Sequence, residues 1–249
     1  VCKLRIIKMS EGNLVRINKF LSEIGYCSRR AADTLVEEGR VKVNGVVAVM
    51  GAKITPDDVV MVDDKLVTRP KEDFVYIAFN KPVGVVCTTD IDNEKDNIID
   101  YINHPQRIFP IGRLDKESEG LLLLTNDGEL THHSTHPSFG VEKTYFVEIF
   151  APITKEQISE LKSGIRLEDG LARPLKVEAI PGQNWARVVI HEGRNQIVRR
   201  MFDELGQPVQ RLVRLAFGPI VLGELPVGKW RELNVAEVLS LQKVISIKR

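Results

Sequence analysis

The sequence predicts an α+β protein built in two parts, and three observations support this prediction. Apolar runs of strand length and segments of helical period follow one another irregularly, which does not fit a strict βαβ alternation. Glycine and proline turns bound most of these runs. The texture also changes near Phe74, where a short module with two helices and a small sheet gives way to a strand-rich part. In that larger part we expect a mixed, mainly antiparallel sheet flanked by helices.

The expected organisation is an extension over 1–14, a compact module over 15–67, a linker over 68–73 and a larger domain over 74–249. The linker TRPKED is polar and contains a proline, as is typical of connections between domains. A length of 249 residues suits one small and one medium domain. We expect no membrane span and no signal peptide, because no apolar run is long enough.

The composition excludes several classes of protein. Hydrophobic residues make up 43% and charged residues 28% of the chain, which supports a packed core. The net charge is only +1, so any affinity for nucleic acid has to come from local clusters. Cys2, Cys27 and Cys87 are odd in number and far apart, which gives no disulfide framework and fits a reducing cytoplasm. The chain has no P-loop, dinucleotide-binding or GxSxG motif.

Clear signals bound the expected elements of the small module. Gly25 stands where a helix C-terminal glycine belongs, and Ser28 is a good N-cap for the next helix. Valines alternate around Asn44-Gly45, a pair that favours a hairpin because both turn positions need a positive φ. The expected elements are helices over 17–24 and 28–39, a hairpin over 41–49 and a strand over 59–62.

Basic residues of the module are placed where they would attract an anion. Arg29 and Arg30 fall in the first turn of the second helix, where the dipole disfavours cations by roughly 0.3–1 kcal/mol each. A nucleic-acid phosphate would explain them, whereas an ordinary solvated surface is the alternative because acids about balance the bases. The residues alone leave both interpretations open. Bases that would extend the patch are Arg16, Lys19, Arg40 and Lys42.

The larger part begins with FVYIAFNKPVGVVCTT, residues 74–89, which predicts a strand, a sharp turn and a second strand. Farther along, the run of four leucines over 121–124 lies between a glycine and the turn Asn-Asp-Gly at 126–128, which predicts a buried strand. The further elements expected are a short helix over 96–102, strands over 142–150 and up to His191, a helix with a capping box at Thr154 and Gln157, and a closing helix over 235–243 with Asn234 as N-cap.

A helix expected over 195–205 carries cations at its unfavourable end. Arg194, Arg199 and Arg200 crowd its N-terminal half, where the dipole favours anions. We therefore expect an anion nearby. The acid of a structural salt bridge is the modest interpretation, and a catalytic carboxylate or an RNA phosphate is the stronger one.

Candidate catalytic groups reduce to one acid with bases and a tyrosine around it. His132, His133 and His136 have metal-like spacing, but the surrounding THHSTHPS is typical of a loop, and no cysteine is near. Asp115 stands just before the four leucines and two residues after Arg113. No second carboxylate stands at a fixed spacing, which gives a two-acid glycosidase little support.

Two sets of motifs each resemble a known family. RINKFLSEIGYCSRRAADTLVEEGRVKVNG resembles an S4-type RNA-binding domain. NKPVG (80–84), GRLDKESEGLLLLTNDGEL (112–130), EKTYFV (142–147) and HEGRN with IVRRMF (191–202) are similar, in order and spacing, to the motifs of bacterial rRNA pseudouridine synthases of the RsuA class. The resemblance runs from about residue 15 to residue 233. The stretch 96–116 further resembles the large-subunit enzymes of the RluF and RluB kind.

The resemblance implies a role for each matching residue. Asp115 is implied to be the catalytic acid, Tyr145 to stack on the uracil, and Arg199 to pair with Asp115. At Ile197 relatives often carry glutamine, which leaves any contact made by that glutamine in doubt. The substrate- and RNA-binding residues implied are Arg113, Lys81, Lys143, Arg194 and Arg200 in the larger domain, and Arg29, Arg30, Arg16 and Lys19 in the S4-like module.

The implied reaction is the isomerisation of a uridine to pseudouridine in 23S rRNA, by a monomer in the cytoplasm. It changes no oxidation state and needs no energy input, so no cofactor or metal is expected. It needs one ionised carboxylate as nucleophile or base, and the base must leave its stack at a cost of a few kcal/mol. The reaction is expected at an RluF-like site of 23S rRNA. The alternatives are the same reaction on 16S rRNA or at the RluB-type 23S site, and a non-catalytic S4-type RNA-binding factor in ribosome assembly.

Overall fold

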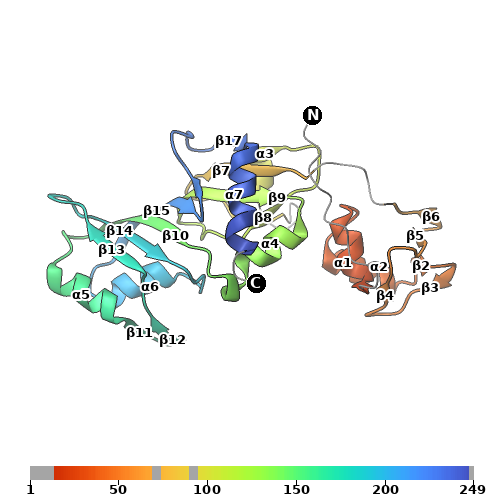
Figure 1. Ribbon diagram of the computed structural model, residues 1–249, viewed down its shortest axis with the longest axis horizontal. Helices are drawn as coiled ribbons and strands as arrows, with labels where there is room; N and C mark the ends of the chain where they lie inside the picture. Colours follow the sequence, from red (N-terminus) through yellow and green to blue (C-terminus); the bar gives the residue numbers. More distant parts are fainter. Residues whose placement is uncertain (1–13, 69–73, 90–94, 247–249) are drawn as a thin grey trace. The chain divides into compact units, whose positions relative to one another are not determined.

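The computed structural model describes residues 14–68, 74–89 and 95–246 of the chain. The chain divides into two compact units, residues 1–73 and 74–249, which are drawn as ribbons in Figure 1. The predicted extension over 1–14 and the predicted linker over 68–73 lie outside the described residues, apart from Leu14 and Thr68.

The N-terminal unit contains the two predicted helices and a small antiparallel sheet. The helices are α1 (Ile17–Glu23) and α2 (Arg29–Glu37), and the four-stranded sheet has the order β3-β2-β5-β6. Its strands are β2 (Val41–Val43), β3 (Val46–Val47), β5 (Val60–Val62) and β6 (Lys65–Leu66), and β1 (Val15–Arg16) pairs separately with β4 (Lys53–Ile54). One core joins both helices to the sheet through Ile17, Leu21, Ala32, Val36, Val41 and Val60.

The turn and capping residues of this unit behave as their chemistry predicts. The hydroxyl of Ser28 accepts a hydrogen bond from the main-chain N–H of Ala31 at 3.1 Å, which caps α2. Asn44 and Gly45 have φ values of 51° and 83° between β2 and β3, as a two-residue hairpin turn requires. Gly25 follows α1 with a φ of 78°.

The larger unit is built on one nine-stranded sheet with the order β13-β14-β10-β15-β9-β7-β17. All paired strands are antiparallel except β15 and β9, which run parallel, so the sheet is mixed and mainly antiparallel as predicted. The strands are β7 (Tyr76–Lys81), β9 (Glu119–Thr125), β10 (Lys143–Ile149), β13 (Lys176–Ala179), β14 (Trp185–Ile190), β15 (Val209–Phe217) and β17 (Trp230–Glu232), with β8 (Phe109–Ile111) on β9 and β16 (Ile220–Val221) on β15.

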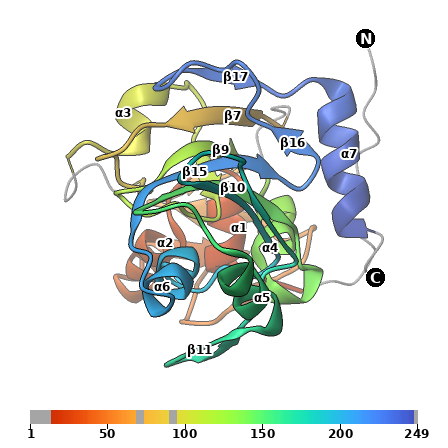
Figure 2. The same cartoon turned by 90° about the vertical axis from the view of Figure 1, so that its left-hand side faces the viewer.

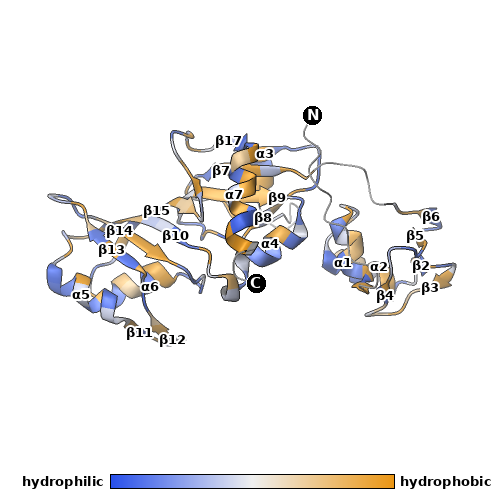
Figure 3. Ribbon diagram, in the orientation of Figure 1, coloured by the Kyte–Doolittle hydropathy of each residue, from blue (hydrophilic) through white to orange (hydrophobic). Residues whose placement is uncertain are grey.

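Helices cover the sheet through two separate hydrophobic cores. The first core takes side chains from α3 (Ile98–Ile102), α5 (Lys155–Ser163) and α6 (Ile197–Glu204), and the second from α4 (Gly128–Thr135) and α7 (Val235–Ser246). Figure 2 shows α5 and α6 together, away from α7, which stands beside β16. In Figure 3 the central strands and most of α7 are hydrophobic, whereas α5 is largely hydrophilic. The short elements left are η1 (Pro137–Phe139) and the hairpin of β11 (Ile165–Leu167) and β12 (Gly170–Ala172).

The two cores explain why β9 contains four consecutive leucines. Leu121 and Leu123 belong to the core with α4 and α7, whereas Leu122 and Leu124 belong to the core with α3. Because successive side chains of a strand point to opposite faces, a strand covered on both faces needs a continuous apolar run. The predicted buried strand is therefore confirmed, and all seven residues of β9 are buried.

The predicted second strand after the turn at Pro82 does not form. Its residues make only one isolated bridge, between Val86 and Asn97. The returning segment has no free strand edge to join, because β7 is already paired with β9 on one side and with β17 on the other. Val85 and Cys87 are nevertheless buried in the first core.

The histidine-containing segment is a helix, and the predicted loop there was wrong. Asp127, expected in a turn, is the N-cap of α4, and its carboxylate accepts from the main-chain N–H of Leu130 at 2.9 Å. The same carboxylate accepts from the hydroxyl of Tyr76 at 3.0 Å. An acid at the end of a strand can close a turn or start a helix, and here the buried Leu130 fixes the second outcome.

The parallel junction between β9 and β15 depends on one glycine. Gly120 lies opposite Arg214, with a φ of 102°. A Cβ atom at residue 120 would lie 2.4 Å from the carbonyl oxygen and 2.7 Å from the nitrogen of Arg214. Only a residue without a side chain allows these two strands to approach so closely.

Gly120→Ala is therefore expected to destabilise the larger unit by more than about 3 kcal/mol, because both backbones would have to move apart. Gly206→Ala is the matched control, since Gly206 also has a positive φ, of 67°, but nothing lies within 4 Å of its added Cβ. Its expected cost is about 1–2 kcal/mol of backbone strain. Urea unfolding of both variants measures the difference, and equal losses would show that the close approach is unimportant.

Candidate active site

The loop between β8 and β9, residues 112–118, carries the acid that the sequence singled out and is called the Asp115 loop. It begins at Gly112, whose φ is 74°, and the N–H of Ser118 donates to the carbonyl of Asp115 at 3.0 Å. Leu114 and Ser118 are buried, whereas Asp115 is half-buried. Because the loop leads directly into the central strand β9, it holds Asp115 at the edge of the core.

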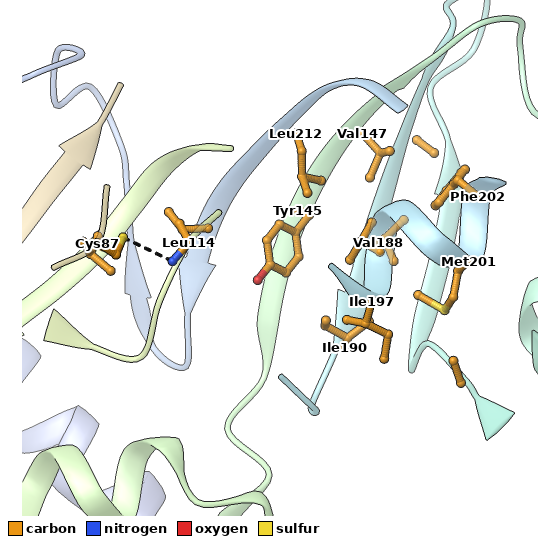
Figure 4. Packing of buried hydrophobic residues seen from close by; sticks show 14 of the residues in the cluster. Cys87, Leu114, Tyr145, Val147, Val188, Ile190, Ile197, Met201, Phe202 and Leu212 are labelled. Atoms are coloured by element: carbon orange, nitrogen blue, oxygen red, sulfur yellow. Dashed lines mark hydrogen bonds between the residues drawn. The ribbon is translucent and has the colours of Figure 1, made fainter. Parts of the chain in front are cut away.

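Two hydrogen bonds, each donated by a main-chain N–H, fasten the loop to the segment after β7. The N–H of Gly84 donates to the carbonyl of Lys116 at 2.8 Å. The N–H of Leu114 donates to the sulfur of Cys87 at 3.3 Å, and Figure 4 shows this bond. Burial raises the pKa of the Cys87 thiol, so the sulfur acts as a neutral acceptor.

Lys81 supports the loop from inside the protein. It is 0% exposed, and burial lowers its pKa, an effect that the negative charges of Asp115 and Glu117 partly oppose. The ammonium of Lys81 is buried too deeply to make the direct contact with RNA expected from the sequence. Its role is to shape the turn after β7 and the Asp115 loop. The ammonium donates to three main-chain carbonyls, those of Val85 at 2.8 Å, Pro82 at 3.0 Å and Lys116 at 3.4 Å.

Arg199 does not form the implied ion pair with Asp115. Its guanidinium donates instead to the carbonyl of Glu117 at 3.0 Å and to the carbonyl of Val209 at 3.1 Å. Both terminal nitrogens are therefore occupied by main-chain oxygens from two different segments. Arg199 of helix α6 thus binds the backbone of the Asp115 loop and forms no hydrogen bond with the Asp115 carboxylate.

Tyr145 of β10 lies beside this loop. It is 7% exposed and belongs to the core that includes α6. Figure 4 shows its ring between Leu114 on one side and Val188 and Ile197 on the other. Within the sheet Tyr145 is directly opposite Arg214 of β15. The sheet therefore brings an aromatic ring next to the segment that carries the acid.

Lys143, two residues earlier on β10, is a cation with an altered proton affinity. Its ammonium donates to the carbonyl of His191 at 3.4 Å and lies 5.7 Å from the centre of the Phe217 ring. Burial lowers its pKa to about 8, and the positive charge of Arg214 acts in the same direction while Glu192 opposes it.

The other arginines of α6 and the segment before it are held by acids. Arg194 pairs with Glu192 at 2.7 Å and with Asp169 at 2.8 Å, and Arg200 binds both oxygens of Asp169 at 2.9 and 3.0 Å. Arg200 lowers the pKa of the Asp169 carboxyl most, and Arg194 contributes. The anion expected near these arginines is therefore the acid of a structural salt bridge. It is Asp169, which joins the turn between β11 and β12 to α6.

A shallow depression of about 410 Å³ lies next to the Asp115 loop. Arg113 is exposed, lines this depression and makes no ion pair with a described residue. The depression is lined by threonine hydroxyl groups and one guanidinium together with apolar atoms. Its lining residues are Cys87, Thr88, Thr89, Pro110, Gly112, Arg113, Thr131 and Thr135.

The basic patch predicted for the N-terminal unit divides into paired and unpaired side chains. Lys19 pairs with Glu23 along α1 at 3.4 Å. Arg40 binds Asp63 at 2.7 Å, and Lys42 binds Asp64 at 2.6 Å. Of the residues predicted for the patch, those that are exposed and make no ion pair with residues 14–68 are Arg16, Arg29 and Arg30. These three remain available to an anionic partner.

The rings of His132, His133 and His136, in α4 and at its C-cap, form a cluster of tilted ring contacts with Phe139. In the ranges that the structure describes, no three or more histidine, cysteine or acidic side chains are grouped as metal ligands would be. Over the same ranges, no helix has both the length and the apolar character needed to span a bilayer.

Sequence reasoning missed two residues of this site. Cys87 gave no signal, since its partner is a main-chain N–H that only the fold supplies. Arg214 did give a signal, because in VQRLVRLAF it falls two residues after the buried Leu212, on the inward-facing phase of the strand. A charged residue at an inward position of a strand is unusual enough to mark a site.

The comparisons with known proteins agree with one another. The model of the RNA pseudouridylate synthase family matches residues 75–204, and that of the S4 domain matches residues 15–60. The chain is 42% identical to the dual-specificity RNA pseudouridine synthase RluF of Escherichia coli (strain K12), over 93% of this chain and 79% of that protein. It is 43% identical to an uncharacterized RNA pseudouridine synthase of Aquifex aeolicus (strain VF5), over 94% of this chain and 96% of that one.

A solved structure supports the same assignment. A crystal structure of a pseudouridylate synthase matches with a TM-score of 0.68 and 33% identity, over 91% of this chain and 99% of that chain. The chain therefore belongs to the RNA pseudouridylate synthase family and carries an S4 domain before the catalytic domain. It is an isomerase that acts on RNA, and among its relatives are the RluF enzymes.

The lowered pKa of Lys143 predicts a specific dependence of stability on pH. Burial disfavours the charged form, so below about pH 8 the folded state carries a penalty, which disappears as pH rises toward the ordinary value of 10.5. Between these pH values the unfolded chain binds more protons, and the free energy of unfolding should rise relative to that of Lys143→Met. Denaturant unfolding of both proteins across this range measures it, and parallel curves would contradict it.

Proposed function

We propose that this enzyme converts a uridine of 23S rRNA to pseudouridine and that Asp115 is its catalytic carboxylate. One observation carries the proposal, namely that Asp115 is half-buried in the middle of a loop whose backbone is fixed by Lys81, Arg199 and Cys87. A rigid loop of this kind presents one acid in one place. The resemblance of residues 96–116 to large-subunit enzymes and the identity with RluF support the choice of RNA.

The chemistry accounts for the groups around Asp115. The bond between ribose C1′ and uracil N1 breaks, the base turns, and C1′ joins C5, which then loses its proton while N1 gains one. The step needs an ionised carboxylate, as nucleophile or as base at the sugar. The buried charge of Lys81 attracts that carboxylate, and protein screens this attraction less than water does.

The target base must leave its stack to reach a half-buried acid. Unstacking costs a few kcal/mol, and contact with an aromatic side chain recovers about 1–3 kcal/mol of it. Tyr145 is the aromatic residue beside the Asp115 loop, and Arg113 is the exposed cation that lines the neighbouring depression. In this proposal Tyr145 contacts the uracil, Arg113 supports the RNA that loses the base, and Lys143 and Arg199 position the groups around them.

The S4 domain supplies affinity for structured RNA in this proposal. Its three unpaired arginines, Arg16, Arg29 and Arg30, contact phosphates, with Arg29 and Arg30 in the first turn of α2. An enzyme of ribosome biogenesis with three dispersed cysteines suits the cytoplasm, and we propose that it acts there as a monomer.

Asp115→Asn should abolish pseudouridine formation, by at least about 1,000-fold, while RNA affinity changes little, because the amide cannot act as nucleophile or base. Tritium release from a 5-tritiated 23S rRNA transcript measures the rate, and filter binding measures the affinity. Glu117→Gln is the matched control, since Glu117 is an exposed acid of the same loop.

Different outcomes separate the alternatives. An active Asp115→Asn enzyme would remove Asp115 from its role, and a wild-type enzyme that releases tritium only from 16S rRNA would move the substrate to the small subunit. A wild-type enzyme that binds the RNA but modifies none of it would favour the ribosome-assembly factor. Mapping the modified uridine in a deletion strain decides between sites within 23S rRNA.

The double substitution of Arg29 and Arg30 by alanine should weaken RNA binding uniformly and flatten its salt dependence. Each lost phosphate contact lowers the slope of log K against log salt by about 0.7–0.9. The single-turnover rate at saturating enzyme should stay within about threefold of wild type, because neither residue belongs to the catalytic unit. Lys42→Ala is the control, since Lys42 already pairs with Asp64; an unchanged slope in the double variant would contradict the phosphate contacts.

A further inference from the structure

Arg214 is a buried cation that the proposed mechanism has not used. It is 2% exposed and is the largest fully buried side chain among the described residues. Its Nε donates to the carbonyl of Leu121 at 2.7 Å, and its Nη1 donates to the carbonyl of Arg113 at 3.2 Å. Its Nη2 is buried and has no hydrogen-bond partner among the described residues.

An arginine in this situation is costly to the fold. Arg214 makes no ion pair with a described acid, and its guanidinium lies 5.6 Å from the centre of the Phe217 ring. A buried charge without an opposite charge costs several kcal/mol, and a buried donor without an acceptor adds about 1–3 kcal/mol. A methionine or leucine would fill the same space without either cost. The residue therefore calls for an explanation beyond packing.

The strand positions place Arg214 at the centre of the site. It lies directly opposite Tyr145 across the antiparallel pair β10-β15, so the two side chains are neighbours on one face. Across the parallel pair it lies opposite Gly120, whose missing side chain lets β9 approach. Its Nη1 binds the carbonyl of Arg113, two residues from Asp115. Arg214 thus bridges the aromatic ring and the Asp115 loop.

The Asp115 loop also carries an acceptor that has no protein donor among the described residues. The carboxylate of Asp115 accepts no hydrogen bond from any residue in the described ranges, although its carbonyl binds Ser118. Arg199, the other arginine that binds this loop, has committed both terminal nitrogens to carbonyls and keeps only its Nε free. Of these two arginines, only Arg214 has a terminal nitrogen that is not already hydrogen-bonded to a described residue.

We propose that Arg214 is a positioning residue for the isomerisation. Two of its nitrogens hold the backbone of β9 and of the Asp115 loop, and its Nη2 donates to the Asp115 carboxylate when the uridine enters and the site closes around it. The role rests on the proposed assignment of Asp115. Its charge also reaches Lys81 and Lys143, whose pKa values it helps to lower, so it belongs to the same electrostatic unit.

The test compares Arg214→Met and Arg214→Lys in the full-length enzyme. Arg214→Met should lower the single-turnover rate of tritium release by about 100-fold, the size of effect that a misplacement of about 1 Å produces, with an RNA Kd within about threefold. Arg214→Lys keeps the charge but not the three-way fork, and it should recover about tenfold of that loss. Arg211→Met is the matched control, because Arg211 lies on the same strand but is 53% exposed and pairs with Glu119.

The split between rate and affinity distinguishes positioning from a general loss of structure. A folded Arg214→Met enzyme within about threefold of the wild-type rate would overturn the proposal, as would a loss of RNA affinity that accounts for the whole effect. If Arg214→Met does not fold, the lysine variant decides: about tenfold slower at unchanged Kd supports the role, and wild-type speed overturns it.

Failure of the proposed function gives a different result. The wild-type enzyme is assayed first on the 23S transcript and then on total bacterial RNA. Activity on total RNA without activity on the 23S transcript counts against the 23S substrate, and the Arg214 variants are then compared on total RNA. An Asp115→Asn enzyme that remains active counts against Asp115, and Arg214 then has no carboxylate to position.

Discussion

Two buried cations beneath one loop are the constraint on which the catalytic unit depends. Lys81 and Arg214 come from strands on either side of β9, and both direct hydrogen bonds at main-chain carbonyls of the Asp115 loop. Carbonyl dipoles stabilise a buried charge only when they are held in place, so the loop and the cations fix each other. This mutual arrangement leaves positive charge close to a single half-buried acid without neutralising it by a salt bridge.

The order of strands determines which residues can share this site. The parallel contact between β9 and β15 places the segment after Asp115 beside Arg214, although about a hundred residues separate them in sequence. The antiparallel contact between β15 and β10 adds Tyr145 and Lys143. Gly120 permits the first contact, because any side chain there would meet the backbone of β15. A local requirement for one glycine therefore has consequences for the whole site.

The arginines near the start of α6 show how a conflict with the helix dipole is resolved. Asp169 neutralises Arg194 and Arg200, whereas Arg199 binds two carbonyls. One set of cations thus secures the hairpin of β11 and β12, and the other secures the Asp115 loop. In the S4 domain the comparable cations at the start of α2, Arg29 and Arg30, form no ion pair with an acid in residues 14–68, which leaves them available to an anionic partner.

The sequence by itself determined the α+β class, the helices with their caps at Ser28 and Thr154, the leucine strand, and Asp115 and Tyr145 as candidate residues. These follow from local signals: side-chain period, capping chemistry and motifs within a few residues. Only the tertiary structure decided that Arg199 binds carbonyls and not Asp115, that Asp169 receives Arg194 and Arg200, that Asp127 begins a helix, and that Arg214 lies under the loop. Each of these depends on which strands and helices become neighbours, and a partner far away in sequence leaves no periodic or compositional trace.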